Sequence, residues 1–379
     1  MTIVGKRANQ EGSIYKRKDG RWVASIVLEN NKRKSIYCKT QQEAMKAIRE
    51  VNQQKDQGIL LTSEDQTLSN FLTTWLQDIA KHNVRIRTYE RYRELITLHI
   101  IPVLGKTNLQ KLLPQQLQSL YNQKLEEGYA PQTVKHIHRV LHKALNDALK
   151  WQLVIRNVSN AVSPPRVPKK EMRVLSGEQA QQFLEASQED PFETLYVLAL
   201  TTGMRQGELL GLKWEDIDLA IGILQVKRTI TRLVGKGFTV SEPKTTQSRR
   251  RIHLTKLAIE ALKQHRIRQR EARLAAGPEW LDQGWVFCNT IGSPVEVGNM
   301  IRRSFRPILI KAELPIIRFH DLRHSAASLL LILGVHAKVV QELLGHSQIS
   351  VTLDTYSHVL PSMQEDAMNR LDTLLSRTV

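Results

Sequence analysis

Hydrophobic and polar positions alternate near the start of the chain and then change to a helical repeat. In "SIYKRKDGRWVASIVLE", two β-prone stretches flank Asp19–Gly20, which predicts a hairpin. A second turn at Asn30–Lys32 leads into a third short strand. The next stretch, "TQQEAMKAIREV", begins with Thr40 and Glu43 at the spacing of a capping box, and apolar residues follow three and four apart. Residues 12–58 are therefore predicted to form a three-stranded sheet backed by one helix.

Residues 66–156 carry apolar positions at helical spacing and predict several amphipathic helices. In the last of these helices, "PQTVKHIHRVLHKALNDALKW", the expected buried stripe is Val134, Ile137, Leu141, Leu145 and Leu149. The polar, proline-rich residues 157–171 then predict a linker.

The remainder of the chain mixes helical and strand patterns. An apolar helix, "PFETLYVLALTTG", ends at Gly203, short strand-like stretches follow, and the pattern from "RFHDLRHSAASLLLILGV" onwards is helical. We therefore expect a multidomain chain that is mainly α with small β-sheets. Its parts are a sheet-plus-helix domain at 1–60, a helical domain at 66–156 and an α+β domain at 172–379.

Composition narrows the class of protein. Hydrophobic residues make up 41% of the chain, enough for real cores, but the longest apolar run, Ala326–Val335, is too short to cross a bilayer. The first residues lack the apolar segment of a signal peptide. Two cysteines, Cys38 and Cys288, are too few for a disulfide framework or a cysteine-rich zinc site. These features predict a cytoplasmic protein without a membrane partner.

The net charge of +18 is concentrated in the first half of the chain. Residues 1–60 hold 13 Lys and Arg against 6 Asp and Glu, and residues 61–170 hold 16 against 8. Such an excess over two whole segments predicts a polyanionic partner, most commonly nucleic acid. A merely solvated basic surface is the alternative.

Basic side chains cluster in the predicted sheet and in the helical domain. We expect the face of the sheet that the helix leaves free to display Lys and Arg, with Tyr15, Trp22 and Tyr37 nearby, and such a sheet can enter a major groove. The candidate DNA-binding residues are Lys16, Arg17, Lys18, Arg21, Lys32, Arg33, Lys34, Arg87, Arg91, Arg93, Lys135 and Arg139. His138 and His142 are four residues apart but have no third ligand nearby, which favours DNA-facing or packing roles over a metal site.

Six polar residues of the last domain stand at unusual places: Arg205, Lys244, His320, Arg323, His346 and Tyr356. Each alone has an ordinary interpretation. Arg205 can pair with Glu208, a turn lysine is usually solvated, and a tyrosine is usually a core residue with a polar tip. Together they suit phosphoryl transfer. Arginines bind the phosphate oxygens, a lysine or histidine protonates the leaving oxygen, and a tyrosine hydroxyl attacks phosphorus.

Metal-dependent alternatives fit the sequence poorly. In "HDLRH", Asp321 stands where a zinc protease has Glu, and Arg323 would bring a positive charge towards the ion. The sequence contains no P-loop motif and no obvious carboxylate cluster for two-metal nuclease chemistry. We therefore expect neither a metal site nor a cofactor.

Residues 172–360 resemble the catalytic domain of the tyrosine recombinases, the phage integrase family. Four stretches carry the resemblance in the family's order: "TTGMRQGELLGLKWEDID", "EPKTTQSRRRI", "HDLRHSAASLLL" and "LLGHSQISVTLDTYSH". By this resemblance Arg205 is the first arginine, Lys244 the hairpin lysine, and His320 and Arg323 the H-x-x-R pair. His346 is then the second histidine, Tyr356 the nucleophile, and Glu208 the acidic residue that supports Arg205.

The resemblance implies a recombinase that cuts through a 3′-phosphotyrosine, forms a Holliday junction and needs neither metal nor ATP. It also implies a helical, SAM-like core-binding domain at 66–156. The N-terminal domain resembles the arm-binding domain of integrases from temperate phages and integrative conjugative elements. The implied partners are core-type and arm-type DNA sites, three further copies in a tetramer, a host bending protein and an excisionase. A type IB topoisomerase and a catalytically idle DNA-binding regulator are the alternatives.

The tail "SMQEDAMNRLDTLLSRTV" predicts one more amphipathic helix. Its apolar stripe comprises Ala367, Met368, Leu371, Leu374 and Leu375. An amphipathic helix of this kind packs on its own domain or, as the resemblance implies, on a neighbouring protomer.

Overall fold

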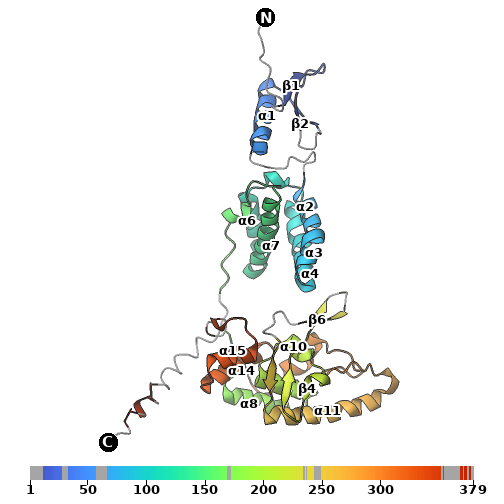
Figure 1. The fold of residues 1–379 in the computed structure, drawn as a ribbon, viewed down its shortest axis with the longest axis vertical. Helices are drawn as coiled ribbons and strands as arrows, with labels where there is room; N and C mark the ends of the chain where they lie inside the picture. Colours follow the sequence, from blue (N-terminus) through green and yellow to red (C-terminus); the bar gives the residue numbers. More distant parts are fainter. Residues whose placement is uncertain are drawn as a thin grey trace. The chain divides into compact units, whose positions relative to one another are not determined.

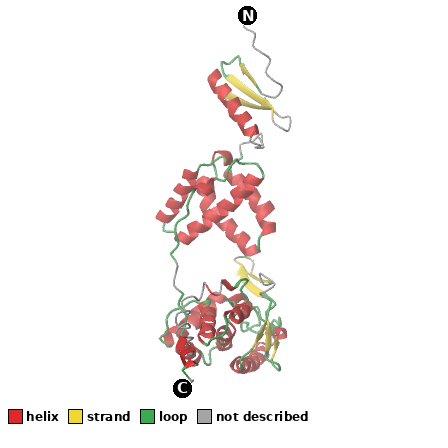
Figure 2. Cartoon of the chain, turned by 60° about the vertical axis from the view of Figure 1, so that its left-hand side comes forward, coloured by secondary structure: helices red, strands yellow, loops and turns green. Residues whose placement is uncertain are grey.

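The computed structural model describes residues 12–27, 33–56, 66–168, 172–233, 235, 237–242, 249–350, 353, 368–369, 371–373 and 375–376 (Figure 1). The chain divides into two compact units, Met1–Lys169 and Lys170–Val379. The first unit holds a small sheet and a group of helices, and the second mixes helices with short strands (Figure 2).

The N-terminal sheet forms as the sequence predicts. Strands β1 (Ser13–Lys16), β2 (Trp22–Val27) and β3 (Arg33–Cys38) pair antiparallel in that order, and helix α1 (Gln41–Asp56) follows. The capping box is confirmed: the Glu43 N–H donates to Thr40 Oγ1 at 3.2 Å, and the Thr40 N–H donates to the Glu43 carboxylate at 3.3 Å. Apolar residues of β2 and α1 form the core between sheet and helix: Ala24, Ile26, Ala44 and Ile48.

Strand register decides which residues the free face of the sheet displays. Tyr15 pairs with Val23, and Val23 pairs with Tyr37, so these three side chains share one face. Val23 is fully buried between two tyrosines that are about half exposed. The prediction for Trp22 is wrong, because side chains alternate along a strand and Trp22 packs against the core on the helix side.

The second part of the first unit is helical. Its elements are α2 (Leu68–Trp75), η1 (Leu76–Ala80), α3 (Lys81–Asn83), α4 (Ile86–Leu95), η2 (Ile96–Ile100), α5 (Ile101–Leu104), η3 (Leu109–Lys111), α6 (Pro114–Glu126), α7 (Pro131–Lys150) and η4 (Val158–Ala161). The predicted stripe of α7 is buried except at Leu149, which is exposed. Ala148 takes the buried place, because it continues the helical repeat three residues after Leu145.

The segment expected to be a linker, residues 157–171, begins on the helical core. Val158 and Val162 are buried in that core, and the Asn157 amide donates to the His142 carbonyl at 3.0 Å. Residues 163–168 follow without regular secondary structure.

The second unit is built around one apolar helix, α9. Its helices are α8 (Gly177–Ala186), α9 (Glu193–Thr202), α10 (Gln206–Leu210), η5 (Trp214–Asp216), α11 (Lys256–Ala276), η7 (Gly277–Glu279), α12 (Val297–Met300), η8 (Ile301–Phe305), α13 (Arg306–Lys311), α14 (Asp321–Ile332) and α15 (Ala337–Leu344). Helix α9 packs against α11 and α14 and is buried on nearly all sides, as expected of a helix without a polar face. Tyr196 of α9 is fully buried, which confirms it as a core residue.

Two small antiparallel sheets complete this unit. Strands β4 (Ile217–Asp218), β5 (Ile223–Gln225) and β8 (Arg251–His253) form one sheet, and β6 (Thr229–Leu233) pairs with β7 (Gly237–Ser241). Among the residues that the structure describes, no helix is both long and apolar enough to cross a membrane.

Candidate active site

Arg205 stands at the junction between α9 and α10. Gly203 ends α9 with a φ of 60°, a left-handed conformation that glycine adopts at little cost, and Arg205 caps α10. The Arg205 Nη1 donates to Glu208 Oε1 at 2.8 Å, and its backbone N–H donates to Oε2 at 3.1 Å. The Glu208 side chain is only 4% exposed, whereas that of Arg205 is 38% exposed. The buried carboxylate thus fixes the guanidinium group of a side chain that is itself partly exposed.

Arg323 reaches the same junction from α14. Its side chain is buried, and its Nη1 donates to the Gly203 carbonyl at 2.7 Å. This contact joins residues 120 positions apart in the sequence and brings the second arginine to the point where α9 ends.

His346 follows the end of α15. Gly345 ends this helix in a left-handed conformation with a φ of 67°. The Gly345 carbonyl accepts a hydrogen bond from Arg205 Nη2 at 3.2 Å, so the turn before His346 is joined directly to the first arginine.

His320 immediately precedes α14, and the ring of His324 meets it edge to face. The ring centroids are 5.0 Å apart and the planes are perpendicular. The Asp321 carboxylate accepts two hydrogen bonds from Arg318, one from its backbone N–H at 2.7 Å and one from its Nη2 at 2.7 Å. Within the described ranges no group of three or more His, Cys, Asp or Glu side chains is arranged to hold a metal ion.

Burial and neighbouring cations shift the titration of these groups. Burial, followed by the charge of Arg323, lowers the pKa of His320. The same causes, with the added charge of Arg205, lower the pKa of His346 to about 4. Both imidazoles are therefore neutral near pH 7 and able to accept a proton. Burial acts to raise the pKa of Glu208, but the charges of Arg250 and Arg205 outweigh it, so that pKa is lowered and the carboxylate is ionised.

Arg250 belongs to this cluster although sequence reasoning missed it. Its Nη2 donates to Glu208 Oε2 at 3.0 Å, and its side chain is only 6% exposed. The signal was present in the run Arg249–Arg251 before the buried Ile252. Alternation along a strand places Arg250 on the same side as Ile252 and leaves Arg251 exposed.

The structure brings together four of the six predicted site residues: Arg205, His320, Arg323 and His346. The charges of Arg323 and Arg205 contribute to the lowered pKa values of both His320 and His346. Lys244 and Tyr356 lie outside the described residues.

The candidate DNA-binding residues of the sheet lie mainly around its first turn. Arg17 and Arg21 each lie 5.6 Å from the centroid of the Tyr37 ring, and Arg21 also pairs with Asp19 at 2.8 Å.

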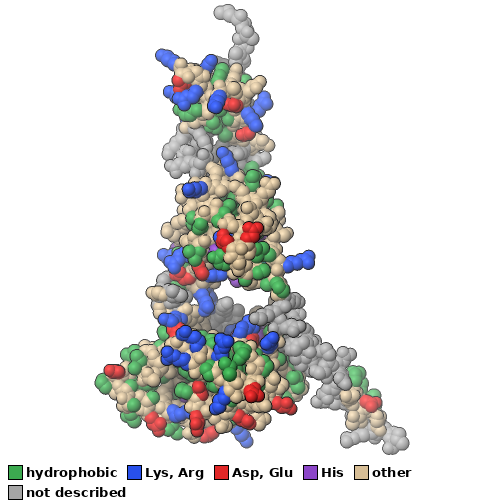
Figure 3. Space-filling view, turned by 180° about the vertical axis from the view of Figure 1, so that it is seen from behind, with side chains coloured by type: hydrophobic (Ala, Val, Ile, Leu, Met, Phe, Trp, Pro, Cys, Tyr) green, Lys and Arg blue, Asp and Glu red, His purple; other side chains and the backbone are tan. Residues whose placement is uncertain are grey.

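The other candidates of the sheet differ in exposure and in the face that they occupy. Lys18 and Arg33 are exposed. Lys16 is exposed too, but it pairs with Trp22 and so belongs to the helix side of the sheet. Lys32 and the side chain of Lys34 lie outside the described residues. Figure 3 shows Lys and Arg side chains spread over the surface of this part of the chain.

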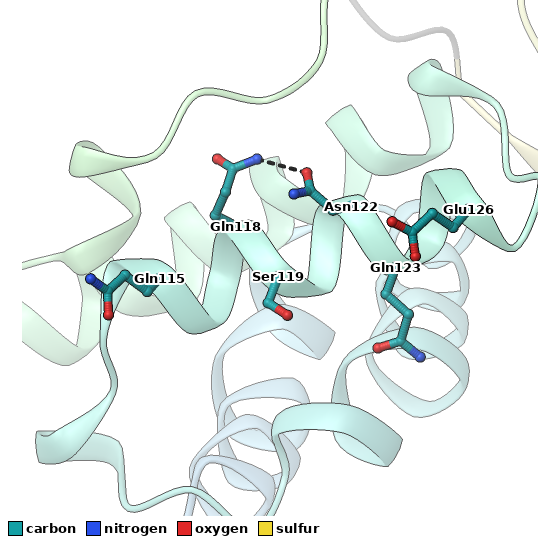
Figure 4. A pocket seen from close by; sticks show the side chains of 6 residues that line it. All are labelled: Gln115, Gln118, Ser119, Asn122, Gln123 and Glu126. Atoms are coloured by element: carbon teal, nitrogen blue, oxygen red, sulfur yellow. Dashed lines mark hydrogen bonds between the residues drawn. The ribbon is translucent and has the colours of Figure 1, made fainter.

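The candidates of the helical part lie on α4 and α7. Arg87, Arg93 and Arg139 are exposed, and Arg91 and Lys135 are partly buried. Arg91 pairs with Glu94 at 2.8 Å. By contrast, the outer face of α6 borders a shallow pocket without any Lys or Arg in its lining (Figure 4): Gln115, Gln118, Ser119, Asn122, Gln123 and Glu126. The lining of this pocket therefore offers no cation to a polyanion.

Two of the three histidines of α7, His138 and His142, pack within the helical part. The Tyr121 hydroxyl lies 3.1 Å from His138 Nδ1, and the Asn146 amide lies 3.2 Å from His142 Nδ1. These contacts fit the packing role that the sequence favoured over a metal site.

Comparison with known proteins finds relatives that cover most of the chain. Residues 173–363 match the phage integrase family, and residues 67–125 match the SAM-like N-terminal domain of phage integrases. A XerC-like tyrosine recombinase from Caldanaerobacter subterraneus subsp. tengcongensis is 32% identical over 366 residues, which cover 91% of this chain and 93% of the relative.

Solved structures share the fold. The Tn1549 transposon integrase in complex with a circular intermediate DNA matches with a TM-score of 0.66 and 23% identity, over 80% of this chain and 99% of that one. A lambda integrase tetramer bound to a Holliday junction matches with a TM-score of 0.57 and 20% identity, over 93% of this chain and 97% of that one. The predicted fold class, mainly helical with small antiparallel sheets, is confirmed.

Proposed function

The chain belongs to the phage integrase family, a family of site-specific DNA recombinases, and we propose that it cuts and rejoins strands through a 3′-phosphotyrosine at Tyr356. The observation that carries the proposal is the convergence of two arginines and two neutral histidines at the end of α9. This set of groups suits transfer of a phosphoryl group between two oxygen atoms.

The arginines supply the positive charge. Arg205, which is partly exposed and held by Glu208, and Arg323 bind the non-bridging oxygens of the scissile phosphate. Negative charge grows on these oxygens as the tyrosine attacks, and fixed cations stabilise it without reorganising. We therefore propose that cleavage needs neither a metal ion nor ATP.

Proton transfers complete the step. The Tyr356 oxygen forms a bond to phosphorus while the bond from phosphorus to the 5′-oxygen breaks. Neutral His320 accepts the proton of the tyrosine hydroxyl, and Lys244 donates a proton to the leaving 5′-oxygen. Attack by the 5′-hydroxyl of a partner strand reverses these transfers and completes one exchange, and two such exchanges pass through a Holliday junction.

The other parts of the chain select the DNA. We propose that residues 1–60 bind arm-type sites, residues 66–156 bind core-type sites and residues 172–379 cut, with residues 157–171 as the connection. The exposed cations of the sheet and of α4 and α7 support this division. The reaction would integrate and excise a mobile element such as a temperate phage or an integrative conjugative element, with a host bending protein and an excisionase as further partners.

A tetramer on DNA is the expected assembly, as in the lambda integrase structure. Most of the predicted tail helix lies outside the described residues, but three of its apolar side chains are described and exposed: Met368, Leu371 and Leu375. An exposed apolar stripe supports packing on a neighbouring copy.

The experiment uses a nicked suicide duplex made from the DNA beside the protein's own gene, with excess EDTA present. The wild-type chain should form a covalent protein–DNA adduct, and Tyr356→Phe should bind the duplex without forming one. Tyr196→Phe is the matched control, because Tyr196 is the only other tyrosine after residue 170 and lies in the core. Adduct formation by Tyr356→Phe would refute the nucleophile, and a requirement for added Mg²⁺ would refute the metal-free reaction.

A further inference from the structure

The buried side chain of Arg250 connects two elements of the candidate site. Its Nη2 donates to Glu208 Oε2 at 3.0 Å, and its Nε donates to the Leu343 carbonyl at 2.5 Å. A Cβ atom on Gly345 would lie 3.0 Å from Arg250 Nη1, so the guanidinium packs closely under the turn that precedes His346. One buried side chain therefore contacts both α10 and the end of α15.

Glu208 divides its carboxylate between two arginines. Oε1 accepts from Arg205 at 2.8 Å, and Oε2 accepts from Arg250 at 3.0 Å. The Arg205 Nη2 in turn donates to the Gly345 carbonyl. These contacts close a ring that runs from Arg250 through Glu208 and Arg205 to the Leu343–Gly345 turn and back.

We propose that Arg250 is a positioning residue for strand cleavage: it holds Glu208 and the Leu343–Gly345 turn so that Arg205 and His346 keep one geometry. The inference rests on the proposed function, because it assigns a role within that reaction. Arg250 does not touch the phosphate in this role and acts through Glu208 and the turn.

The chemistry of the side chain explains why arginine is needed. A planar guanidinium donates in several fixed directions at once, and here it serves a carboxylate and a carbonyl from different elements. A lysine ammonium keeps the charge but cannot reproduce the rigid fork. Misplacement of a catalytic group by about 1 Å can lower a rate about a hundredfold.

The test measures single-turnover adduct formation at saturating suicide duplex for Arg250→Gln and Arg250→Lys. Both rate constants should fall, up to about a hundredfold for Arg250→Gln, while DNA affinity stays unchanged. Arg251→Gln is the matched control: it removes the same charge from the next residue, the first of β8, whose side chain is exposed. It should react at the wild-type rate. Arg250→Gln should cost less in a Glu208→Gln background than in the wild type, because Glu208→Gln already breaks the part of the linkage that runs through the carboxylate.

The outcomes separate positioning from mere stability. A purely structural Arg250 would lower the melting temperature and the fraction of molecules that react, while the folded fraction reacts at the wild-type rate. That result, or additive effects in the double variant, would overturn the proposal. If Arg250→Gln fails to fold, Arg250→Lys decides by the same rate constant. A wild-type chain that forms no adduct would refute the proposed function itself, whereas an active wild type with an equally fast Arg250→Lys would refute only the positioning role.

Discussion

Replacing Glu208 by alanine should destabilise the second unit strongly, because Glu208 is the buried anion between two arginines. Its side chain is 4% exposed and that of Arg250 is 6% exposed, so the variant leaves a buried cation without its counter-ion. Breaking a buried ion pair in this way typically costs about 3–5 kcal/mol. The contact with Arg205 adds little, because that side chain is partly solvated.

Calorimetry of the full chain can measure this loss in the transition of the second unit. For a unit of this size, the expected destabilisation corresponds to a melting temperature lower by roughly 6–20 °C. Glu215→Ala is the control, because this carboxylate is 64% exposed where it pairs with Arg228 and should contribute less than about 1 kcal/mol. If Glu208→Ala cost no more than the control, the reasoning that the site is built around a buried, charged Glu208 would be wrong.

Three further predictions concern catalysis, DNA binding and pH. Arg323→Ala should slow adduct formation at saturating DNA by about a hundredfold to a thousandfold, which is the effect of losing one oxyanion donor. A single-turnover rate near that of the wild type would contradict the role of Arg323 in binding the phosphate. Deleting residues 1–60 removes 13 basic and 6 acidic side chains. The deletion should weaken arm-site binding and make that binding less dependent on salt, while core-site cleavage survives. A binding titration at several salt concentrations can check the change in salt dependence. His324 and His346 each have a pKa lowered to about 4, chiefly by burial, so the unfolded chain takes up protons first and stability should fall as the pH drops from about 6.5 towards 4. His346→Gln should make urea midpoints less dependent on pH in that window, and an unchanged dependence would count against its lowered pKa.

Local sequence signals predicted much of the fold. The hairpin at Asp19–Gly20 and the capping box of Thr40 and Glu43 are set by residues close together in the chain, and both are present. The prediction for Trp22 is wrong, because a one-residue shift in a strand moves a side chain to the opposite side of the sheet. The prediction that Leu149 is buried is also wrong, because at the end of this helix Ala148 continues the buried stripe.

The candidate site was predictable only where the sequence holds compact motifs. Arg205, His320, Arg323 and His346 each lie in such a motif, and the structure gathers them. Their actual contacts were beyond sequence reasoning, because Arg323 reaches Gly203 across 120 residues and Arg250 reaches Glu208 across 42. Strand alternation places Arg250 on the side of the buried Ile252, but its role depends on Glu208, which lies 42 residues away in the sequence.

The central claim is that Tyr356 becomes joined to DNA at this site. The adduct trapped on a suicide duplex can be digested with nuclease and protease, and mass spectrometry can then locate the modified residue and the end of the DNA that it carries. We predict a single modified peptide that contains Tyr356 linked to a 3′-phosphate. A nucleotide on any other residue, or a 5′-phosphate linkage at Tyr356, would contradict the account.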